Sequence, residues 1–217
     1  ENIELCDDAD VKNFVGAYEP EHYLLKHENP LAVGPYGVSP YYMDAKIGQA
    51  EAMKNAKQVI LDVGKKFGEM TGRSYGFFEA YRLEDAETAV LLIGSSAGTA
   101  RAAVDQLRAE GKKVGMLKLR VFRPFPDEEL AAALGHLKAL AIMDKAESFS
   151  NAGGPLGAEV RGALYDLDVR PKTINYVYGL GGRDFRVQDC RTVFEALDEV
   201  VRTGETGARY RHLGQRE

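Results

Sequence analysis

The sequence has few cysteines. Cys6 and Cys190 are its two cysteines, so at most one disulfide can form, and the set of thiolates that an iron–sulfur cluster needs is missing. We therefore expect redox chemistry to be nearly excluded for this chain alone. We interpret both cysteines as packed thiols rather than reactive ones.

Long apolar runs and blocks of basic residues are also missing. No apolar stretch approaches the roughly 20 residues that span a bilayer, and the opening ENIELCDDAD lacks the basic and then apolar pattern of a signal peptide. We expect a cytoplasmic protein with no membrane partner. The net charge is -5 and lysine and arginine are scattered, so we expect no nucleic-acid partner either.

Signatures of common catalytic sites are absent as well. The four histidines show no metal-site spacing such as H-x-x-x-H and are interpreted as solvated side chains: His22, His27, His136 and His212. The segment GSSAG places its serine one position early for a G-x-S-x-G elbow, so nucleophilic serine chemistry is not expected. A carboxylate at a strand end such as Asp144 could act as a general base. We predict no metal site and no catalytic residue in this chain.

The length and the opening residues suggest a domain with an accessory segment. A chain of 217 residues with 45% hydrophobic content can form one sizeable α/β domain, since it buries roughly 70% of its unfolded surface. The first residue is Glu, and the opening segment is polar, so we interpret the chain as a piece of a larger polypeptide. We expect residues 1–41 to form an extended linker arm that wraps over another surface, because they lack apolar periodicity and contain Pro20, Pro30, Pro35 and Pro40.

An amphipathic helix is predicted after the arm. Within residues 42–70, apolar residues recur at intervals of three and four, and charged residues occupy the other positions. The stripe consists of Ile47, Ala50, Met53, Ala56, Ile60, Val63 and Phe67.

Strands and helices then alternate. We predict strand-like structure in GRSYGFFEAYRL and strands over 89–93, 114–122, 172–178 and the segment that ends at Asp144. Helices are predicted over 97–110, from Asp127 onward, over 158–164 and over 187–202. This order predicts an α/β fold over 42–204, with a mostly parallel open sheet and helices on both faces. Residues 205–217 are interpreted as a polar tail.

The turn after strand 89–93 has two possible roles. Its glycines and hydroxyls are Gly94, Ser95, Ser96, Gly98 and Thr99. They do not match the G-x-G-x-x-G fingerprint, and no lysine follows as in a phosphate loop. Free N–H groups beside these hydroxyls can hold an anion, but they also suit an N-cap, which we favour.

The carboxyl ends of the predicted strands are where ligand crevices lie in open α/β sheets. Besides the Gly94 turn, they carry FRPFP with Arg120 and Arg123, DKAESFSNAGG with Asp144 and Lys145, and YGLGGRD with Gly181, Arg183 and Asp184. We expect these charges to pair within the chain or to pack against another subunit, with Asp144, Gly181, Arg183 and Asp184 as interface candidates. A small-molecule site is the alternative.

Several segments resemble one known family over almost the whole chain. YRLEDAETAVLLIGSSAGTARAAVDQLRAEGKKVGMLKLRVFRPFP, IMDKAESFSNAGGPLGAEV and YGLGGRDF are similar to the alpha chain of pyruvate:ferredoxin oxidoreductase, within the 2-oxoacid:ferredoxin oxidoreductases. ELCDDADVKNFVGAYEP and AMKNAKQVI resemble the segment that joins the first domain of that family to its second. RPFP is more similar to the pyruvate branch than to the 2-oxoglutarate branch.

The resemblance implies a transketolase C-terminal-like domain. It also implies a complex that decarboxylates pyruvate on thiamine diphosphate with Mg²⁺, passes electrons through [4Fe-4S] clusters to ferredoxin, and transfers the acetyl unit to coenzyme A. The G-D-G motif, the cluster cysteines and the pyrimidine domain are absent from this sequence. The resemblance therefore implies a non-catalytic structural and assembly domain that binds other domains or subunits and meets ferredoxin through the complex. The alternative is an anion or coenzyme A module that uses the Gly94–Thr99 turn and Arg123.

Overall fold

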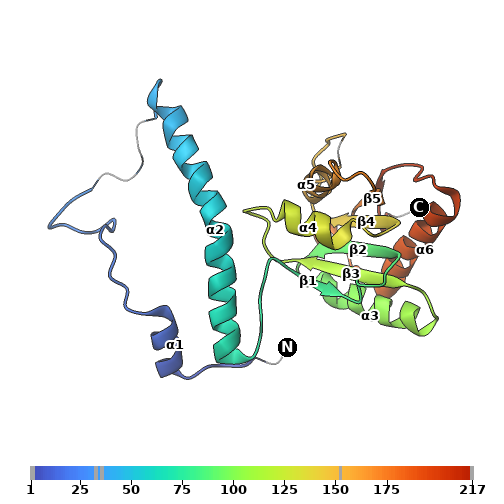
Figure 1. Cartoon of the computed structure of the whole chain (residues 1–217), viewed down its shortest axis with the longest axis horizontal. Helices are drawn as coiled ribbons and strands as arrows, with labels where there is room; N and C mark the ends of the chain where they lie inside the picture. The colour runs from blue at the N-terminus through green and yellow to red at the C-terminus, as the bar shows by residue number, and fades with distance from the viewer. Residues whose placement is uncertain (1–2, 32–33, 35–36, 152, 216–217) are drawn as a thin grey trace. The chain divides into compact units, whose positions relative to one another are not determined.

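The chain consists of two units. A computed structural model describes residues 3–31, 34, 37–151 and 153–215, and its contacts separate Glu1–Tyr75 from Gly76–Glu217 (Figure 1). The boundary lies later than the one expected at residue 42, because the long second helix makes its contacts within the first unit. Among the described residues, no helix combines the length and the apolar composition that a membrane span requires.

The first unit holds two helices, α1 (Asp8–Val15) and α2 (Tyr41–Thr71). Helix α1 forms inside the stretch that was expected to be extended. Its sequence contains no proline, and two acidic residues in its first turn favour the positive end of the helix dipole. Pro20, Pro30 and Pro40 all follow this helix, and Pro35 lies outside the described residues.

Helix α2 confirms the predicted amphipathic segment, but the first unit covers only part of its stripe. Near its end, the ring of Phe67 lies 5.9 Å from that of Phe14 and 5.6 Å from that of Tyr75, between ring centroids. Toward its start, Ile47 remains 52% exposed and Met53 42% exposed. The apolar stripe is therefore only partly buried within its own unit.

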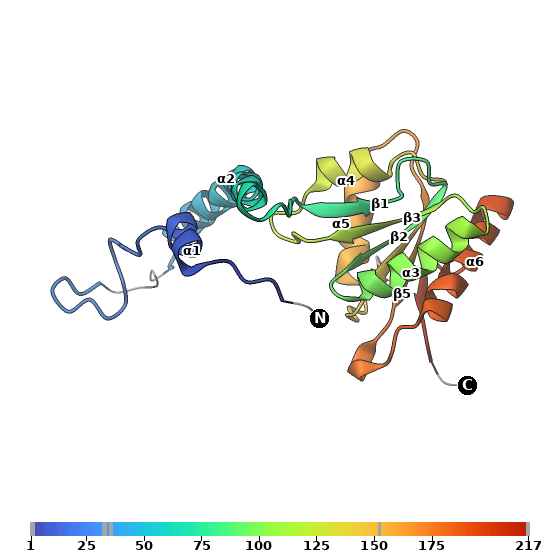
Figure 2. The same cartoon turned by 90° about the horizontal axis from the view of Figure 1, so that it is seen from below.

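The second unit is built on a six-stranded sheet of order β1-β3-β2-β4-β5-β6 (Figures 1 and 2). Strand β1 pairs antiparallel with β3, and every other neighbouring pair is parallel. The predicted mostly parallel open sheet is confirmed. The strands are Phe78–Tyr81, Thr88–Ile93, Val114–Leu119, Ala139–Asp144, Lys172–Val177 and Tyr210–His212 in chain order.

Helices cover both faces of this sheet (Figure 2). They are α3 (Ser96–Ala109), α4 (Asp127–Leu134), α5 (Pro155–Leu164) and α6 (Val187–Thr203), with a 3-10 turn, η1, at Leu180–Gly182. Helices α3 and α6 pack on one face, whereas α4 and α5 pack on the other. Both faces are buried, so strands such as TAVLLI are continuous apolar runs rather than alternating ones.

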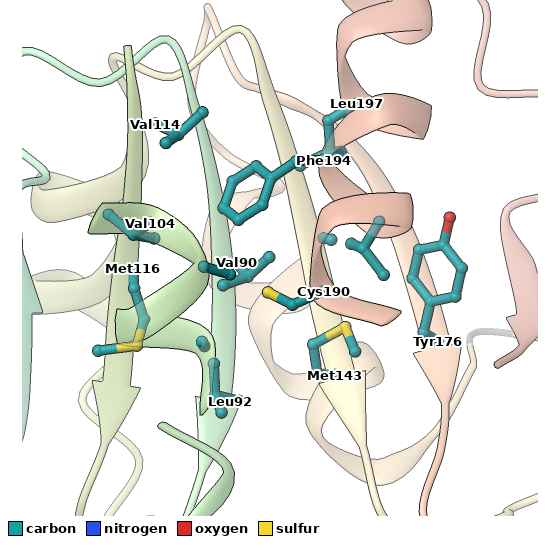
Figure 3. Packing of buried hydrophobic residues seen from close by; sticks show 14 of the residues in the cluster. Val90, Leu92, Val104, Val114, Met116, Met143, Tyr176, Cys190, Phe194 and Leu197 are labelled. Atoms are coloured by element: carbon teal, nitrogen blue, oxygen red, sulfur yellow. The ribbon is translucent and has the colours of Figure 1, made fainter. Parts of the chain in front are cut away.

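The core under α3 and α6 is closely packed (Figure 3). Phe194 of α6 and Val104 of α3 are fully buried over Val90 and Met116 of the strands. Burial of each such side chain contributes about 1.5–3 kcal/mol. Cys190 lies in the same cluster, and burial raises its pKa to about 12, which agrees with an inert packed thiol.

The segment interpreted as a polar tail contains strand β6. Its register with β5 pairs Asn175 with Tyr210 and Val177 with His212. The sequence pattern did not reveal this strand because it is only three residues long, YRH, and lacks an apolar run.

Candidate functional site

The carboxyl ends of four parallel strands meet at one edge of the sheet. Ile93 of β2 lies opposite Leu119 of β3, and Asp144 of β4 lies opposite Val177 of β5. Strand β2 has β3 on one side and β4 on the other, so the chain winds away from it in both directions. Such a switch point is where open α/β sheets form ligand crevices.

A pocket of about 310 Å³ lies at this switch point. Its charged residues are Asp144 and Lys145, and the Lys145 ammonium lies 5.5 Å from the ring centroid of Tyr178. The lining is mostly apolar: Ile93, Phe122, Met143, Asp144, Lys145, Ala146, Pro155, Leu156 and Tyr178. The sequence analysis gave a small-molecule site at these strand ends as the alternative to internal pairing or subunit contact, and the structure brings the strand ends together.

Asp144 holds the start of helix α5. It is 4% exposed, and its carboxylate accepts hydrogen bonds from the backbone N–H groups of Leu156 at 2.9 Å and Gly157 at 3.0 Å. A negative charge there complements the helix dipole and satisfies otherwise unpaired donors. The sequence analysis expected Asp144 to pair within the chain or to contact another subunit, and the structure shows its carboxylate bound within the chain.

Asn175 completes this arrangement from strand β5. Its amide donates to the Asp144 carboxylate at 2.7 Å and to the Ile142 carbonyl at 2.8 Å, while its side-chain oxygen accepts from the Gly154 N–H at 2.6 Å. The side chain is fully buried. The sequence analysis missed Asn175, although a polar residue inside the apolar strand KTINYV is a signal of a buried polar contact.

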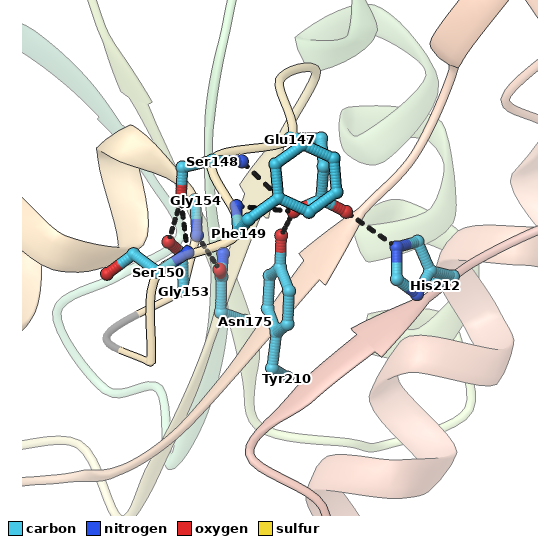
Figure 4. A network of polar contacts seen from close by, with 9 residues as sticks. All are labelled: Glu147, Ser148, Phe149, Ser150, Gly153, Gly154, Asn175, Tyr210 and His212. Carbon is cyan, nitrogen blue, oxygen red and sulfur yellow. Dashed lines mark hydrogen bonds and ion pairs between the residues drawn. The ribbon is translucent and has the colours of Figure 1, made fainter.

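Glu147 anchors the loop after β4 to strand β6 (Figure 4). Its carboxylate accepts hydrogen bonds from the Tyr210 hydroxyl and from the backbone N–H groups of Ser148 at 3.0 Å and Phe149 at 3.1 Å. The Nε2 atom of His212 lies 2.8 Å from the same carboxylate. His212 was interpreted as solvated, but it is paired with a residue far away in the sequence.

The contacts of Glu147 shift the pKa values of two side chains, Glu147 itself and Tyr210. The hydrogen bond from Tyr210 and then that from His212 lower the pKa of Glu147 to about 2. The pKa of Tyr210 is raised to about 12, chiefly by burial and to a smaller extent by the hydrogen bond to Glu147. The carboxylate is therefore charged at neutral pH and fixes the loop.

Phe149 projects from this anchored loop. Its backbone has a φ of 55°, a left-handed conformation that is uncommon for a bulky residue, and its side chain is 92% exposed. Because Glu147 binds the N–H of Phe149, the loop presents the ring from a fixed backbone. The segment SFSN gave no indication of this exposed ring or of its left-handed backbone.

The Gly94–Thr99 turn does not use the side-chain cap that we favoured. Gly94 adopts a φ of 81°, which suits glycine, and Ser95 makes no side-chain cap bond. Helix α3 starts instead with backbone bonds from Ala97 to Gly94 at 3.3 Å and from Gly98 to Ser95 at 3.0 Å. Ser96 is buried and bonds to Tyr178, which offsets part of the rise that burial causes in the pKa of Tyr178.

The charged residues of the remaining loops pair within the chain. The Arg123 guanidinium lies 2.5 Å from Glu159 and stacks on the Phe122 ring at 4.4 Å. Arg120 pairs with Glu79 at 2.7 Å. This agrees with the expectation of internal pairing.

The loop after β5 brings the other three candidates together. Gly181, Arg183 and Asp184 line an open hollow of about 380 Å³ with Leu180 and Gly182. Arg183 donates to the Gly214 carbonyl, whereas Asp184 lies 3.6 Å from Arg186 with both side chains exposed. These residues therefore remain on the surface.

Comparison with known proteins identifies the family. Residues 86–190 match the family model described as pyruvate:ferredoxin oxidoreductase core domain II. The chain is 42% identical over 217 residues to the pyruvate synthase subunit PorA of Thermotoga maritima, covering 100% of this chain and 54% of that protein. It is also 42% identical over 196 residues to the ketoisovalerate oxidoreductase subunit VorA of Pyrococcus horikoshii, covering 90% and 50%. The chain belongs to the 2-oxoacid:ferredoxin oxidoreductase family.

The family match confirms the resemblance that the sequence motifs indicated. The chain spans about half the length of the curated relatives it matches. A 2-oxoglutarate:ferredoxin oxidoreductase from Magnetococcus marinus, solved with 2-oxoglutarate, coenzyme A and succinyl-CoA bound, is similar with a TM-score of 0.43 and 20% identity over 58% of this chain and 20% of that chain.

The region that matches core domain II holds most of the candidate site. The Gly94 turn, Arg123, Asp144 and the loop with Phe149 lie inside residues 86–190. Strand β6, which supplies Tyr210 and His212, lies beyond them. Two of the groups that bind Glu147, the Tyr210 hydroxyl and the His212 ring, therefore come from outside the matched region.

Proposed function

We propose that this chain is a non-catalytic structural and assembly domain of a cytoplasmic pyruvate:ferredoxin oxidoreductase. The whole complex would decarboxylate pyruvate to acetyl-CoA and reduce ferredoxin, with thiamine diphosphate, Mg²⁺, [4Fe-4S] clusters and coenzyme A bound by other parts. The choice of pyruvate over another 2-oxoacid as the substrate rests on the similarity of RPFP to the pyruvate branch.

The observation that carries the proposal is the exposed ring of Phe149 on a backbone that is hydrogen-bonded to Glu147. Aromatic side chains are enriched among the few residues that dominate binding energy at interfaces. A ring held on an ordered backbone loses little conformational entropy when a partner binds it. The Glu147 network supplies that order, so the loop is suited to dock onto another domain or subunit.

The long helix α2 supports the same role. Its exposed residues include Met43, Ile47 and Met53. Their apolar side chains are in contact with water, which is unfavourable in free energy. Another domain or subunit would bury this surface. We propose that residues 1–41 link this helix to such a neighbour and that Gly181, Arg183 and Asp184 contact one.

Co-elution with the remaining subunits tests the proposal. Phe149→Ser should weaken association by roughly 30-fold, as loss of an interface anchor does. Val169→Ser is the matched control, because Val169 is 80% exposed in the loop before β5 and should leave affinity unchanged. Both variants should keep the thermal midpoint of the parent chain. A parent chain that elutes alone, without affinity for the other subunits, would contradict the proposal.

An anion or coenzyme A module is the second candidate. The lack of a side-chain cap on α3 favours it, because the hydroxyls of Ser95 and Thr99 are not used to cap the helix. The pairing of Arg123 with Glu159 counts against it. Calorimetric titration with coenzyme A, pyruvate and phosphate separates the two: heat that Arg123→Ala abolishes supports this module, and the absence of heat removes it.

A further inference from the structure

A basic hollow lies at the opposite edge of the sheet, where strand β5 begins. It has a volume of about 760 Å³, within the usual range for small-molecule sites. Four of its lining residues are cationic and one, Glu205, is acidic. The cations are Arg161, Arg170, Lys172 and Arg209.

Three of the four cations of this basic hollow have no carboxylate partner within the described part of the chain. Among the residues with assigned positions, Arg170, Lys172 and Arg209 form no ion pair. The pKa of Arg161 is lowered by burial and then by the neighbouring charge of Arg209, and the charge of Asp144 acts in the opposite direction. Like charges gathered around one concave surface create a potential that attracts an anion.

Two of the guanidinium groups are already oriented by the protein. Arg161 donates to the Thr173 hydroxyl at 3.1 Å and to the Arg209 carbonyl at 2.9 Å. Arg170 donates to the carbonyl of Tyr165 at 2.8 Å and lies 5.6 Å from the centroid of its ring. Oriented guanidinium groups suit phosphate oxygens, because parallel N–H donors match their geometry.

The chain before β6 forms another wall of the hollow. Gly204 and Gly207 both have positive φ, and Glu205 and Thr206 lie between them. The hydroxyls of Thr173 and Thr206 add neutral polar groups to the lining. The wall therefore combines backbone, hydroxyl and cationic groups.

We propose that the basic hollow binds a polyphosphate anion of the size of a linear triphosphate. Arg170, Lys172 and Arg209 contact its outer oxygens, and Arg161 contributes charge at the base. With four lining cations and a volume of about 760 Å³, the hollow offers more charge and more room than a single phosphate uses, which favours a chain of phosphates. Most of the lining lies at the amino ends of β5 and β6, and Asn151 belongs to the same loop as Phe149, so anion binding and subunit association are measured in separate experiments.

Calorimetric titration of the full chain with sodium triphosphate at low ionic strength tests the site. We expect saturable binding of one anion per chain, and a loss of at least tenfold in affinity in the double variant Lys172→Ala/Arg209→Ala. Both side chains are exposed, so this variant should keep the parent thermal midpoint. The matched control is Lys65→Ala/Lys66→Ala, which removes the same charge from exposed positions on α2 and should retain full affinity.

A second titration, with ATP, shows whether the hollow binds a nucleotide or only the phosphate chain. Tighter binding of ATP than of triphosphate assigns the site to a nucleotide, whereas equal affinity assigns it to the phosphate chain alone. Absence of heat, an equal loss in both double variants, or stronger binding of an acidic peptide than of either phosphate compound overturns the proposal. None of these outcomes depends on subunit association, so the assembly proposal stands or falls separately.

Discussion

The buried amide of Asn175 donates to the buried carboxylate of Asp144 at 2.7 Å, which ties strand β5 to the end of strand β4. Asn175→Leu removes this bond and leaves the Gly154 N–H and the Ile142 carbonyl without their partner. We expect the free energy of unfolding to fall by about 2–3 kcal/mol, because buried groups lose their hydrogen bonds. Urea denaturation measures the change. Gln188→Leu, at an exposed position on α6, is the control and should change stability by less than about 0.5 kcal/mol.

Two glycines of helix α5 should respond to alanine in opposite directions. A Cβ at Gly157 would lie 2.6 Å from the Asn175 side chain, whereas a Cβ at Gly162 would meet nothing within 4 Å. We expect Gly157→Ala to lower stability by about 1–3 kcal/mol through overpacking. Gly162→Ala should raise it by up to about 1 kcal/mol, because alanine loses less backbone freedom in a helix. Thermal midpoints that shift in the same direction would contradict this contact.

The Glu147 network should make stability depend on pH. The folded pKa of Glu147 is about 2, below its ordinary 4.5, so its contribution is fully present above about pH 4.5 and is lost as the pH falls toward 2. Glu147→Gln should therefore unfold at lower urea concentration than the parent chain at pH 6, and the difference should shrink toward pH 2. A constant difference between parent and Glu147→Gln over this range would mean that the carboxylate is not held by these donors.

Thr88 offers a stabilising substitution. Its hydroxyl oxygen is buried and has no hydrogen-bond partner among the residues that the structure describes. Thr88→Val keeps a β-branched side chain and removes the unsatisfied oxygen, so we expect stability to rise by about 1 kcal/mol. Thr192→Val is the comparison, because the Thr192 hydroxyl donates to the Gln188 carbonyl at 3.2 Å, and it should bring no gain. A lower thermal midpoint for Thr88→Val would show that the hydroxyl is satisfied.

The sequence predicted the sheet because each central strand is an apolar run between helices with clear apolar faces. It did not predict α1, which contributes no buried residue, or β6, which is short and polar. Their formation depends on contacts and pairings that a local pattern does not contain. The division at Tyr75 depends in the same way on ring contacts of Phe67 with Phe14 and Tyr75.

The position of the site was more predictable than its contacts. Strand order alone indicates that the Gly94 turn, Asp144 and Arg183 lie toward one edge of the sheet. The pairings involve residues far apart: Arg123 meets Glu159 after 36 residues, and Glu147 meets Tyr210 after 63. Which of several charges pair across such distances is decided by the packed helices and edge strands. A sequence pattern of period two or 3.6 carries no information on that choice.

The central pairing of β2 with β4 also affects how the chain is made. Thr88 lies opposite Ala139, and Glu87 and Lys138, which form an ion pair just before these strands, are 51 residues apart. A ribosome adds that length in a few seconds. During this interval β2 can pair with β3 but has an open, apolar edge on its other side. A nascent chain halted before residue 139 therefore exposes a surface that a chaperone can bind and that the finished domain conceals.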